Sequence, residues 1–374
     1  MKLILTQLAR LGAALVALYG LLLGLTLLIA PGDPGQGALD SARAGESLYL
    51  TEPKYVFFSR SRLNSAQDKV LVVGASNALV GFKQGELQAA LPEQEVHNIA
   101  VSGSNITQMG QIVELVREVQ TPAARRHNTF VLALWYGVFA ADSARWHTPD
   151  RHAGDTDIDL ERYRYGFYTR GQHGAQPLLP PTALDTGAHL VHPYLVLDAV
   201  TRDVTQSWRE RLSGKSRKLT DEERNQRSVR EDEHAGYLAF WRAYMGGVDR
   251  LQDAPFQALS RIVNQIVAEG GRVVLVDLPI PAWHAAGSPL HADYERRLQS
   301  LLPSLADEPA VRVLRLPDGD DDDFSDEVHP KPRVTAGWSQ ALASRLGSSP
   351  NEREQHEHRS SLRQADAGIS RRIR

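Results

Sequence analysis

Residues 69–77 read KVLVVGASN, an uninterrupted apolar run that ends in a turn of small residues carrying Ser76. The consecutive apolar residues Val70–Val73 are typical of a strand buried on both faces, which favours a parallel sheet covered by helices. Ligands of such sheets gather where the strands end, and the start of the next helix adds a partial positive charge there. Ser76 is therefore a candidate nucleophile, although a serine at this position is also commonly a simple helix cap.

The chain on the C-terminal side of this stretch alternates between apolar runs and helical periods. We expect strands at 96–101, 130–134, 272–277 and 311–316, helices at 81–90, 106–119 and 335–346, and helical stretches over 237–269 that are interrupted at Pro255. This alternation predicts one α/β domain over residues 67–346 with a mostly parallel sheet. Residues 142–233 are polar and rich in arginine, and we expect them to form a charged, solvated insertion rather than a dedicated binding patch.

A run without any charge, LGAALVALYGLLLGLTLLIA, occupies residues 11–30 and follows Lys2 and Arg10. Twenty helical residues at about 1.5 Å each span the roughly 30 Å hydrocarbon core of a membrane. We therefore expect residues 1–30 to form an uncleaved single-pass anchor, with a cleaved signal peptide and a buried helix as alternatives. The positive N-terminus predicts that this end is cytoplasmic and that the rest lies outside the inner (cytoplasmic) membrane, on the periplasmic side.

Composition limits the remaining function classes. The 374 residues carry a net charge of −3, which gives no reason to expect nucleic acid as a partner. Cysteine is absent, which excludes disulfides, thiolate metal sites and cysteine nucleophiles. We expect residues 31–66 to be a linker and lead-in, and the polar tail 347–374 to be disordered.

No cofactor or metal site is expected from the sequence. The acidic run 318–323, DGDDDD, is a possible calcium ligand set, but it lacks the glycine spacing of an EF-hand loop. A solvated acidic loop is the simpler interpretation. His356 and His358 lie in the polar tail, where a disordered segment is likewise favoured over a metal site.

A second chemical motif, DEVHP, occupies residues 326–330, just before the last predicted helix. An Asp three residues before a His allows the carboxylate to reach the imidazole Nδ1, orient the ring and stabilise its protonated form. A serine hydroxyl needs such a base, because alone it is a weak nucleophile. By itself the motif is typical of a surface loop, but together with Ser76 it supplies Asp326 and His329 for a Ser-His-Asp set.

The order of these motifs resembles the SGNH (GDSL-like) hydrolase superfamily. Its nucleophilic Ser follows the first strand in a Gly-x-Ser turn, and its Asp-x-x-His precedes the last helix. Residues 98–103, NIAVSG, are similar to the family's second block, whose Gly donates a backbone N–H to the oxyanion hole. The resemblance covers about residues 69–346 and implies a three-layer α/β/α sandwich. Residue by residue, it implies Ser76, Asp326 and His329 as the triad and the N–H groups of Ser76 and Gly103 as oxyanion donors.

The third block departs from the family's pattern. Where the family commonly has Gly-x-Asn-Asp after the third strand, residues 133–139 read ALWYGVF, without the Asn that completes the oxyanion hole. Asn77 and Asn105 are alternative donors. Losing one donor typically costs about 2.7–4 kcal/mol of transition-state stabilisation. A non-catalytic scaffold that binds polysaccharide or organises a synthesis complex therefore remains an alternative.

An anchored, extracytoplasmic SGNH domain looks like the subgroup that includes D-alanyl transfer proteins and alginate O-acetylation proteins. This resemblance implies a serine esterase or O-acyltransferase acting on acyl esters, with acetyl expected, of a cell-envelope or exported polysaccharide. A small ester is the alternative substrate, and an integral-membrane O-acyltransferase is the implied partner. Most aromatic residues near the strand ends are expected in the core or at the rim, but one or two are candidates for stacking on sugars: Trp135, Tyr136, Trp146, Trp283 and Trp338.

Overall fold

The computed structural model describes residues 2–29, 59–140 and 219–347, together with Val56, two short strands between 168 and 177, and single helical positions between 183 and 212. Most of the predicted linker 31–66, most of the predicted insertion 142–233, and the predicted tail from 348 onward lie outside the described residues. Within the insertion, strands β4 (Tyr168–Gly171) and β5 (Gly174–Pro177) form an antiparallel pair that the sequence analysis did not predict.

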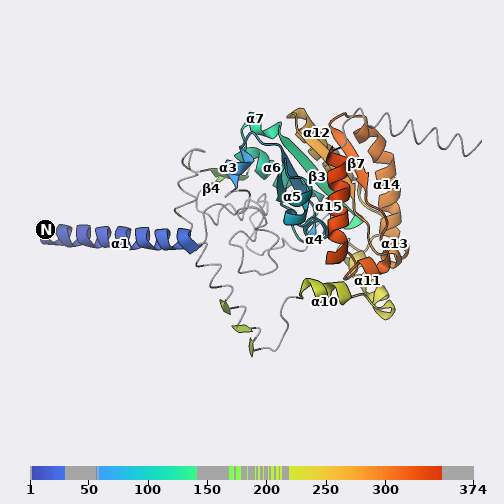
Figure 1. Cartoon of the computed structure of the whole chain (residues 1–374), viewed down its shortest axis with the longest axis horizontal. Coiled ribbons are helices and arrows are strands. Elements are labelled where there is room, and N and C mark those ends of the chain that lie inside the picture. The colour runs from blue at the N-terminus through green and yellow to red at the C-terminus, as the bar shows by residue number, and fades with distance from the viewer. Residues whose placement is uncertain are drawn as a thin grey trace, which may run out of the picture.

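A five-stranded, all-parallel sheet forms the centre of the α/β domain, in the order β2-β1-β3-β6-β7 (Figure 1). Every residue of the two strands β1 and β3 is buried, as expected for neighbouring apolar strands inside a covered sheet. The predicted α/β class and the parallel sheet are confirmed. The strands are β1 (Lys69–Val73), β2 (Glu95–Asn98), β3 (Asn128–Leu134), β6 (Arg272–Asp277) and β7 (Val311–Arg315).

The longer helices around the sheet fall into groups that pack together. Helix α15 (Pro332–Gly347) packs against α4 (Ser76–Gly81) and α5 (Gln84–Ala90), whereas α6 (Ile106–Val119) packs against α12 (Asp253–Ala268). Helix α14 (Pro289–Ala306) runs beside β7 and contacts α13 (Ala282–Gly287), which in turn contacts α11 (His234–Tyr244). The remaining elements are α3 (Arg60–Leu63), α7 (Pro122–Arg125), η1 (Tyr136–Phe139), α10 (Asp221–Gln226), η3 (Glu231–Glu233) and η4 (Asp321–Asp323).

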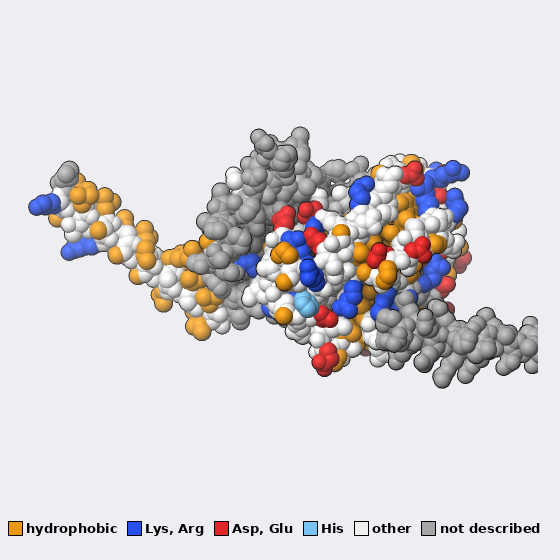
Figure 2. Space-filling view, turned by 90° about the horizontal axis from the view of Figure 1, so that it is seen from above, with side chains coloured by type: hydrophobic (Ala, Val, Ile, Leu, Met, Phe, Trp, Pro, Cys, Tyr) orange, Lys and Arg blue, Asp and Glu red, His pale blue; other side chains and the backbone are white. Residues whose placement is uncertain are grey.

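Helix α1 (Lys2–Ile29) is long and apolar enough to span a membrane. Its apolar side chains are exposed along most of its length, as for Leu15 at 57% and Val16 at 74%. Figure 2 shows this band of hydrophobic side chains, with Lys and Arg side chains near the N-terminal end of the helix. Because such a surface is costly to leave in water, α1 is consistent with the predicted membrane-spanning segment.

The single helix predicted at 81–90 is wrong, because two shorter helices, α4 and α5, lie on either side of Phe82. The Phe82 side chain is fully buried in the core, and its backbone leaves the helical region at φ −116° and ψ 72°. The Asn98 side chain donates hydrogen bonds to the carbonyl groups of Leu79 and Phe82, at 3.2 and 2.6 Å. These bonds satisfy carbonyls that the end of α4 leaves without helical partners.

Strand β2 is shorter than the predicted range 96–101, because Asn98 begins a local turn. Its Oδ1 accepts a hydrogen bond from the Ala100 backbone N–H at 3.1 Å, which competes with the regular strand conformation. The following loop nevertheless stays beside the end of β1, since the Val101 N–H donates to the Gly74 carbonyl at 2.8 Å. The loop that carries Gly103 is thereby held next to the turn that carries Ser76.

The predicted interruption at Pro255 is also wrong. Pro255 lies in the first turn of α12, where the missing N–H has no helical partner to lose. The break occurs earlier, at Gly246 and Gly247, whose φ angles of +87° and +73° suit glycine. Helices α13 and α14 were not predicted, although α14 buries an apolar series at helical spacing: Leu290, Tyr294, Leu298 and Leu305.

Candidate active site

Ser76 lies at the carboxyl end of β1, as the first residue of α4. The turn before it is tightly packed, because a Cβ on Gly74 would lie 2.6 Å from the Ala78 Cβ and 3.0 Å from the Ala133 Cβ. Ala75, in an extended conformation, precedes the helix, and its carbonyl accepts the Leu79 N–H at 3.0 Å. At the first helical position the Ser76 N–H has no partner within the helix, so it is available to a ligand.

Asp326 and His329 lie in a tight loop between η4 and α15. Phe324 and Pro330 close the base of this loop through an isolated antiparallel bridge, and the Ser325 N–H donates to the His329 carbonyl at 2.9 Å. The Asp326 Oδ1 accepts the backbone N–H groups of Val328 and His329, at 3.0 and 2.8 Å. The carboxylate thus orders the backbone that presents the histidine.

The structure brings Ser76, His329 and Asp326 into one hydrogen-bonded chain. The Ser76 Oγ lies 2.8 Å from His329 Nε2, and His329 Nδ1 lies 2.7 Å from Asp326 Oδ2. A carboxylate accepts hydrogen bonds, so Nδ1 carries a proton and Nε2 accepts the Ser76 O–H. The His329 and Asp326 side chains are 27% and 25% exposed, so the chain is reachable from the surface.

The electrostatics of the loop keep Asp326 charged. Burial by itself would raise the pKa of Asp326, but hydrogen bonds from the His329 ring and from two backbone N–H groups hold that pKa below its usual value. Burial raises the pKa of the neighbouring Glu327, and the charge of Asp326 raises it further. The negative charge is therefore concentrated on the carboxylate that faces the imidazole.

The predicted oxyanion donors lie in the neighbouring elements. Gly103 follows β2 with φ +73°, in a loop tied to the Ser76 turn by the Ser104 Oγ, which donates to the Gly74 carbonyl at 2.9 Å. The Asn105 side chain caps α6: its Oδ1 accepts the N–H of Gln108 at 3.1 Å, and its Nδ2 donates to the Ala140 carbonyl at 3.2 Å.

Asn77 is the second amide predicted as a donor. Its side chain is 1% exposed, and its Oδ1 accepts the Ala78 N–H at 3.0 Å. Its Nδ2 is buried and has no hydrogen-bond partner among the residues that the structure describes. Of the two alternative amides, Asn77 is thus the one with unused donor capacity.

The segment after β3 is connected to the loop that carries Asp326 through His284, a residue to which the sequence assigned no role. Tyr136 is fully buried, and its hydroxyl lies 2.6 Å from His284 Nε2 in α13. The His284 Nδ1 in turn lies 2.7 Å from the carbonyl oxygen of Glu327, the residue after Asp326. The signal in the sequence was the position of His284 after the fourth parallel strand, where side chains converge on the edge that carries the site.

A cavity of about 560 Å³ adjoins the triad and includes Asp326 in its wall. Its other walls come from η3, η4, α13 and the start of α11. Trp283 is half-buried there and stacks on His234, with ring centroids 3.9 Å apart and an interplanar angle of 5°. The remaining lining residues are polar or acidic except Val229: Ser228, Glu231, Asp321 and Asp322.

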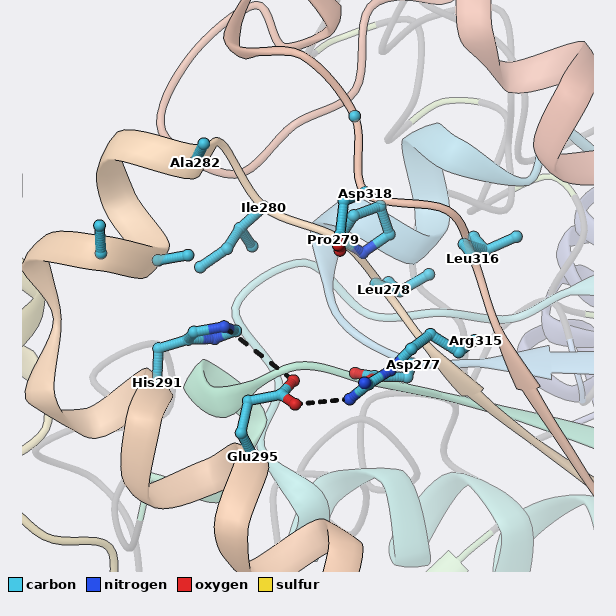
Figure 3. Close-up of a pocket in the computed structure, with 13 residues that line it drawn as sticks. Asp277, Leu278, Pro279, Ile280, Ala282, His291, Glu295, Arg315, Leu316 and Asp318 are labelled. Atoms are coloured by element: carbon cyan, nitrogen blue, oxygen red, sulfur yellow. Dashed lines mark hydrogen bonds and ion pairs between the residues drawn. The ribbon is translucent and has the colours of Figure 1, made fainter. Parts of the chain in front are cut away.

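A second cavity, of about 440 Å³, lies at the carboxyl ends of β6 and β7 (Figure 3). Asp277 accepts hydrogen bonds from the Tyr294 hydroxyl at 2.7 Å and from Arg315 at 2.9 Å, and Arg315 also pairs with Glu295 at 2.6 Å. His291 and Glu295 reach toward these strand ends from α14. Burial raises the pKa of Asp277 despite the hydrogen bonds that it accepts.

The other polar and aromatic candidates have structural contacts. Asp322, in the acidic run, pairs with Lys331 at 2.7 Å and Arg333 at 2.8 Å, which neutralises it. Within the described part of the chain, no group of three or more His, Asp or Glu side chains is arranged to hold a metal. Trp135 and Trp338 are buried in the core, whereas Trp146, His356 and His358 lie outside the described residues.

Comparisons with known proteins leave the assignment of function to this geometry. No family model and no curated protein matches the chain. The arrangement described above has the geometry expected of a nucleophile, a base and an orienting carboxylate, at the edge of a parallel sheet where ligands commonly bind.

Proposed function

We propose that this protein is a membrane-anchored serine esterase or O-acyltransferase of the SGNH type. The observation that carries the proposal is the hydrogen-bonded chain from Ser76 through His329 to Asp326, in which serine and histidine meet across 253 positions of sequence. In the proposed three-layer α/β/α sandwich, α4, α5 and α15 cover one face of the sheet and α6 and α12 the other. The helix contacts described above support this arrangement.

The proposed reaction begins with attack of the Ser76 Oγ on an ester carbonyl carbon. His329 Nε2 takes the hydroxyl proton as the new C–O bond forms, and Asp326 stabilises the resulting imidazolium. The carbonyl electrons move to the oxygen, which the backbone N–H groups of Ser76 and Gly103 hold. When the intermediate collapses, His329 returns the proton to the leaving alcohol and the acyl group remains on Ser76.

The second half of the reaction decides the product. Water attacking the acyl-enzyme completes hydrolysis, whereas a sugar hydroxyl attacking it completes acyl transfer. In both cases His329 takes the proton of the attacking O–H and returns it to the Ser76 Oγ as the bond between the acyl carbon and Oγ breaks. The third oxyanion donor is assigned to Asn77, because its buried Nδ2 has no partner among the described residues. A shift of this side chain toward the Ser76 turn would bring an N–H to the oxyanion.

The substrate and location follow from the resemblance together with α1. The proposed substrate is an acyl ester, with acetyl expected, of a cell-envelope or exported polysaccharide, and the proposed partner is an integral-membrane O-acyltransferase. Helix α1 anchors the chain in the inner membrane, and the α/β domain lies on the periplasmic side. The length and apolar surface of α1 support the anchor.

The proposal is tested by labelling the purified protein with a serine-directed fluorophosphonate probe. The wild-type chain should form one adduct, on Ser76, and Ser76→Ala should abolish it. His329→Ala should suppress labelling although Ser76 remains, since the hydroxyl then has no base. Ser300→Ala, at an exposed serine on α14, is the matched control and should label like the wild type.

A folded wild-type protein that resists the probe would contradict catalysis. If cells carrying Ser76→Ala also made a normally acylated envelope polymer, the non-catalytic scaffold would replace the enzyme as the explanation. Cleavage of p-nitrophenyl acetate by the soluble domain is a second assay, with Ser76→Ala as its blank.

A further inference from the structure

A buried hydrogen-bond chain joins the segment after β3 to the loop that carries Asp326. It runs from the Tyr136 hydroxyl to His284 Nε2 at 2.6 Å, and from His284 Nδ1 to the Glu327 carbonyl at 2.7 Å. Both side chains are 0% exposed. One imidazole therefore joins three parts of the sequence that are far apart: η1, α13 and the loop of residues 324–330 that carries Asp326 and His329 (the triad loop).

The direction of both hydrogen bonds follows from chemistry. A carbonyl oxygen only accepts, so His284 Nδ1 must carry the proton that it shares with Glu327. Burial lowers the pKa of His284 to about 4, so the ring is neutral near pH 7 and Nε2 has a lone pair. Tyr136 then donates its O–H to Nε2. Burial raises the pKa of Tyr136, which keeps this O–H in place.

We propose that His284, oriented by Tyr136, is a positioning residue that holds the Asp326–His329 loop at the distance Ser76 requires. Glu327 directly follows Asp326, so a hydrogen bond to its carbonyl fixes the backbone next to the carboxylate. Among the residues that the structure describes, Asp326 itself hydrogen-bonds to groups within the loop alone: the Val328 and His329 N–H groups and the His329 ring. This inference rests on the proposed function.

The loop has two other anchors, and neither holds the backbone of Glu327. The bridge between Phe324 and Pro330 fixes the base of the loop, and the buried Val328 side chain packs into the core. His284 adds a hydrogen bond to the Glu327 carbonyl at 2.7 Å. Aromatic packing holds the imidazole at a defined angle, since Tyr136 meets it edge-on at 90° with ring centroids 5.5 Å apart.

The same contact accounts for the unusual third block. In place of an oxyanion-donating Asn, the segment after β3 presents Tyr136, whose hydroxyl lies 2.6 Å from His284 Nε2. We therefore infer that this segment supports the general base rather than the oxyanion. A substitution there should change the pH dependence of the reaction at Ser76.

The test compares fluorophosphonate labelling of Ser76 against pH in the full-length protein. The acidic limb of the profile reports protonation of the base. His284→Leu removes both hydrogen bonds at similar volume, and we expect a labelling rate constant lower by about 10- to 100-fold. The limb should also move to lower pH, because an imidazole with a displaced carboxylate partner gives up its proton more easily.

Two variants and one control separate positioning from folding. His284→Asn keeps an N–H donor near the Nδ1 position, so its limb should stay close to that of the wild type. Tyr136→Phe should move the limb in the same direction as His284→Leu, but less. His97→Leu, at an equally buried histidine in β2, should lower the melting temperature without moving the limb.

The inference is overturned if His284→Leu and Tyr136→Phe lower the melting temperature while the limb stays at its wild-type position. If His284→Leu does not fold, the pH profiles of Tyr136→Phe and His284→Asn are compared instead. An acidic limb that stays at the wild-type position in Tyr136→Phe, as it should in His284→Asn, overturns the inference. A wild-type protein that does not label at Ser76 refutes the proposed function, and the positioning role falls with it. Labelling with an unmoved limb leaves the proposed function standing and refutes only the role of His284.

Discussion

Replacing Asp326 by asparagine should separate the proposed catalytic role of this side chain from its structural role. In the wild type, Oδ1 accepts the backbone N–H groups of Val328 and His329 and also lies 2.9 Å from His329 Nδ1, whereas Oδ2 lies closer to Nδ1, at 2.7 Å. An amide has only one oxygen, and the two backbone N–H groups favour it at the Oδ1 position. The amide NH₂ of Asp326→Asn then occupies the Oδ2 position, nearest to His329 Nδ1, where it favours an Nδ1 that accepts rather than donates.

This change inverts the tautomer of the base. With Nδ1 accepting, the imidazole proton lies on Nε2, which points at the Ser76 hydroxyl at 2.8 Å and no longer removes its proton. A wrong tautomer in a Ser-His-Asp set costs about 10⁴-fold in rate, or about 5.5 kcal/mol of activation free energy. We expect the fluorophosphonate labelling rate of Asp326→Asn to fall by this order.

The loss of stability should be much smaller. The two backbone hydrogen bonds persist, but each changes from a charged to a neutral acceptor, which costs about 1 kcal/mol per bond and about 2 kcal/mol together. Asp326→Ala removes both acceptors and should cost about 2–4 kcal/mol in the free energy of unfolding. Because the pKa of Asp326 is lowered in the folded state, its stabilising charge is present above the unfolded pKa and is lost as the pH falls through the folded value.

The assay pairs probe labelling with urea unfolding on the same preparations. At neutral pH, Asp326→Asn should be nearly inactive but clearly folded, and its stability deficit should shrink as the pH falls toward about 3. Labelling within about tenfold of the wild type would refute the tautomer argument, since a misprotonated base predicts about 10⁴. An Asn variant as unstable as the Ala variant would refute the assignment of Oδ1 to the two backbone N–H groups.

Three further predictions concern other parts of the chain. Gly74→Ala should lower the free energy of unfolding by about 1–3 kcal/mol and slow labelling, because its Cβ meets Ala78 and Ala133; Gly337→Ala, with open space in α15, should instead stabilise by about 0.5–1 kcal/mol. Glu269→Gln should cost about 1 kcal/mol at neutral pH, because Arg117 and Arg125 hydrogen-bond this carboxylate and lower its pKa. The deficit in urea unfolding should disappear as the pH falls through this lowered pKa, where the wild-type carboxylate also protonates. A reporter that works only outside the cytoplasm, fused after Arg374, should be active, and activity of a cytoplasm-only reporter at that position would contradict the proposed topology.

The parts of the fold that the sequence predicted are those where one signal dominates. The apolar runs of β1, β3 and β6 allowed no other structure, and the range of α6 was predicted as 106–119 because its apolar residues keep a strict helical spacing. The errors occurred where a tertiary contact overrides local preference. Asn98 ends both β2 and α4 through its side chain, and no periodicity in either segment shows this.

The candidate site likewise contains residues that the sequence predicted and residues whose role depends on tertiary contacts. Ser76, Asp326 and His329 lie in short motifs whose spacing has a chemical meaning, so the sequence was enough to select them and the structure places them within hydrogen-bond distance. The position of His284 after a strand end was visible in the sequence, but its role was not, because its partners are a hydroxyl 148 positions away and a backbone carbonyl. The use of Asn105 as a cap of α6 was likewise hidden, although Asn105 and Gln108 have the spacing of a capping box.

Each strand of the parallel sheet ends in a segment that contributes to this site or to the residues around it. The turn after β1 carries Ser76, the loop after β2 carries Gly103, and the segment after β3 carries Tyr136. The segments after β6 and β7 lead to His284 and to the triad loop. The distances within the site therefore depend on the register of five strands, whereas no single loop sets them alone. This arrangement explains why a buried imidazole is useful here. His284, in the segment after β6, hydrogen-bonds both to the segment after β3 and to the loop after β7. It therefore limits the variation in the distance between Ser76 and His329 that small shifts between neighbouring strands would cause.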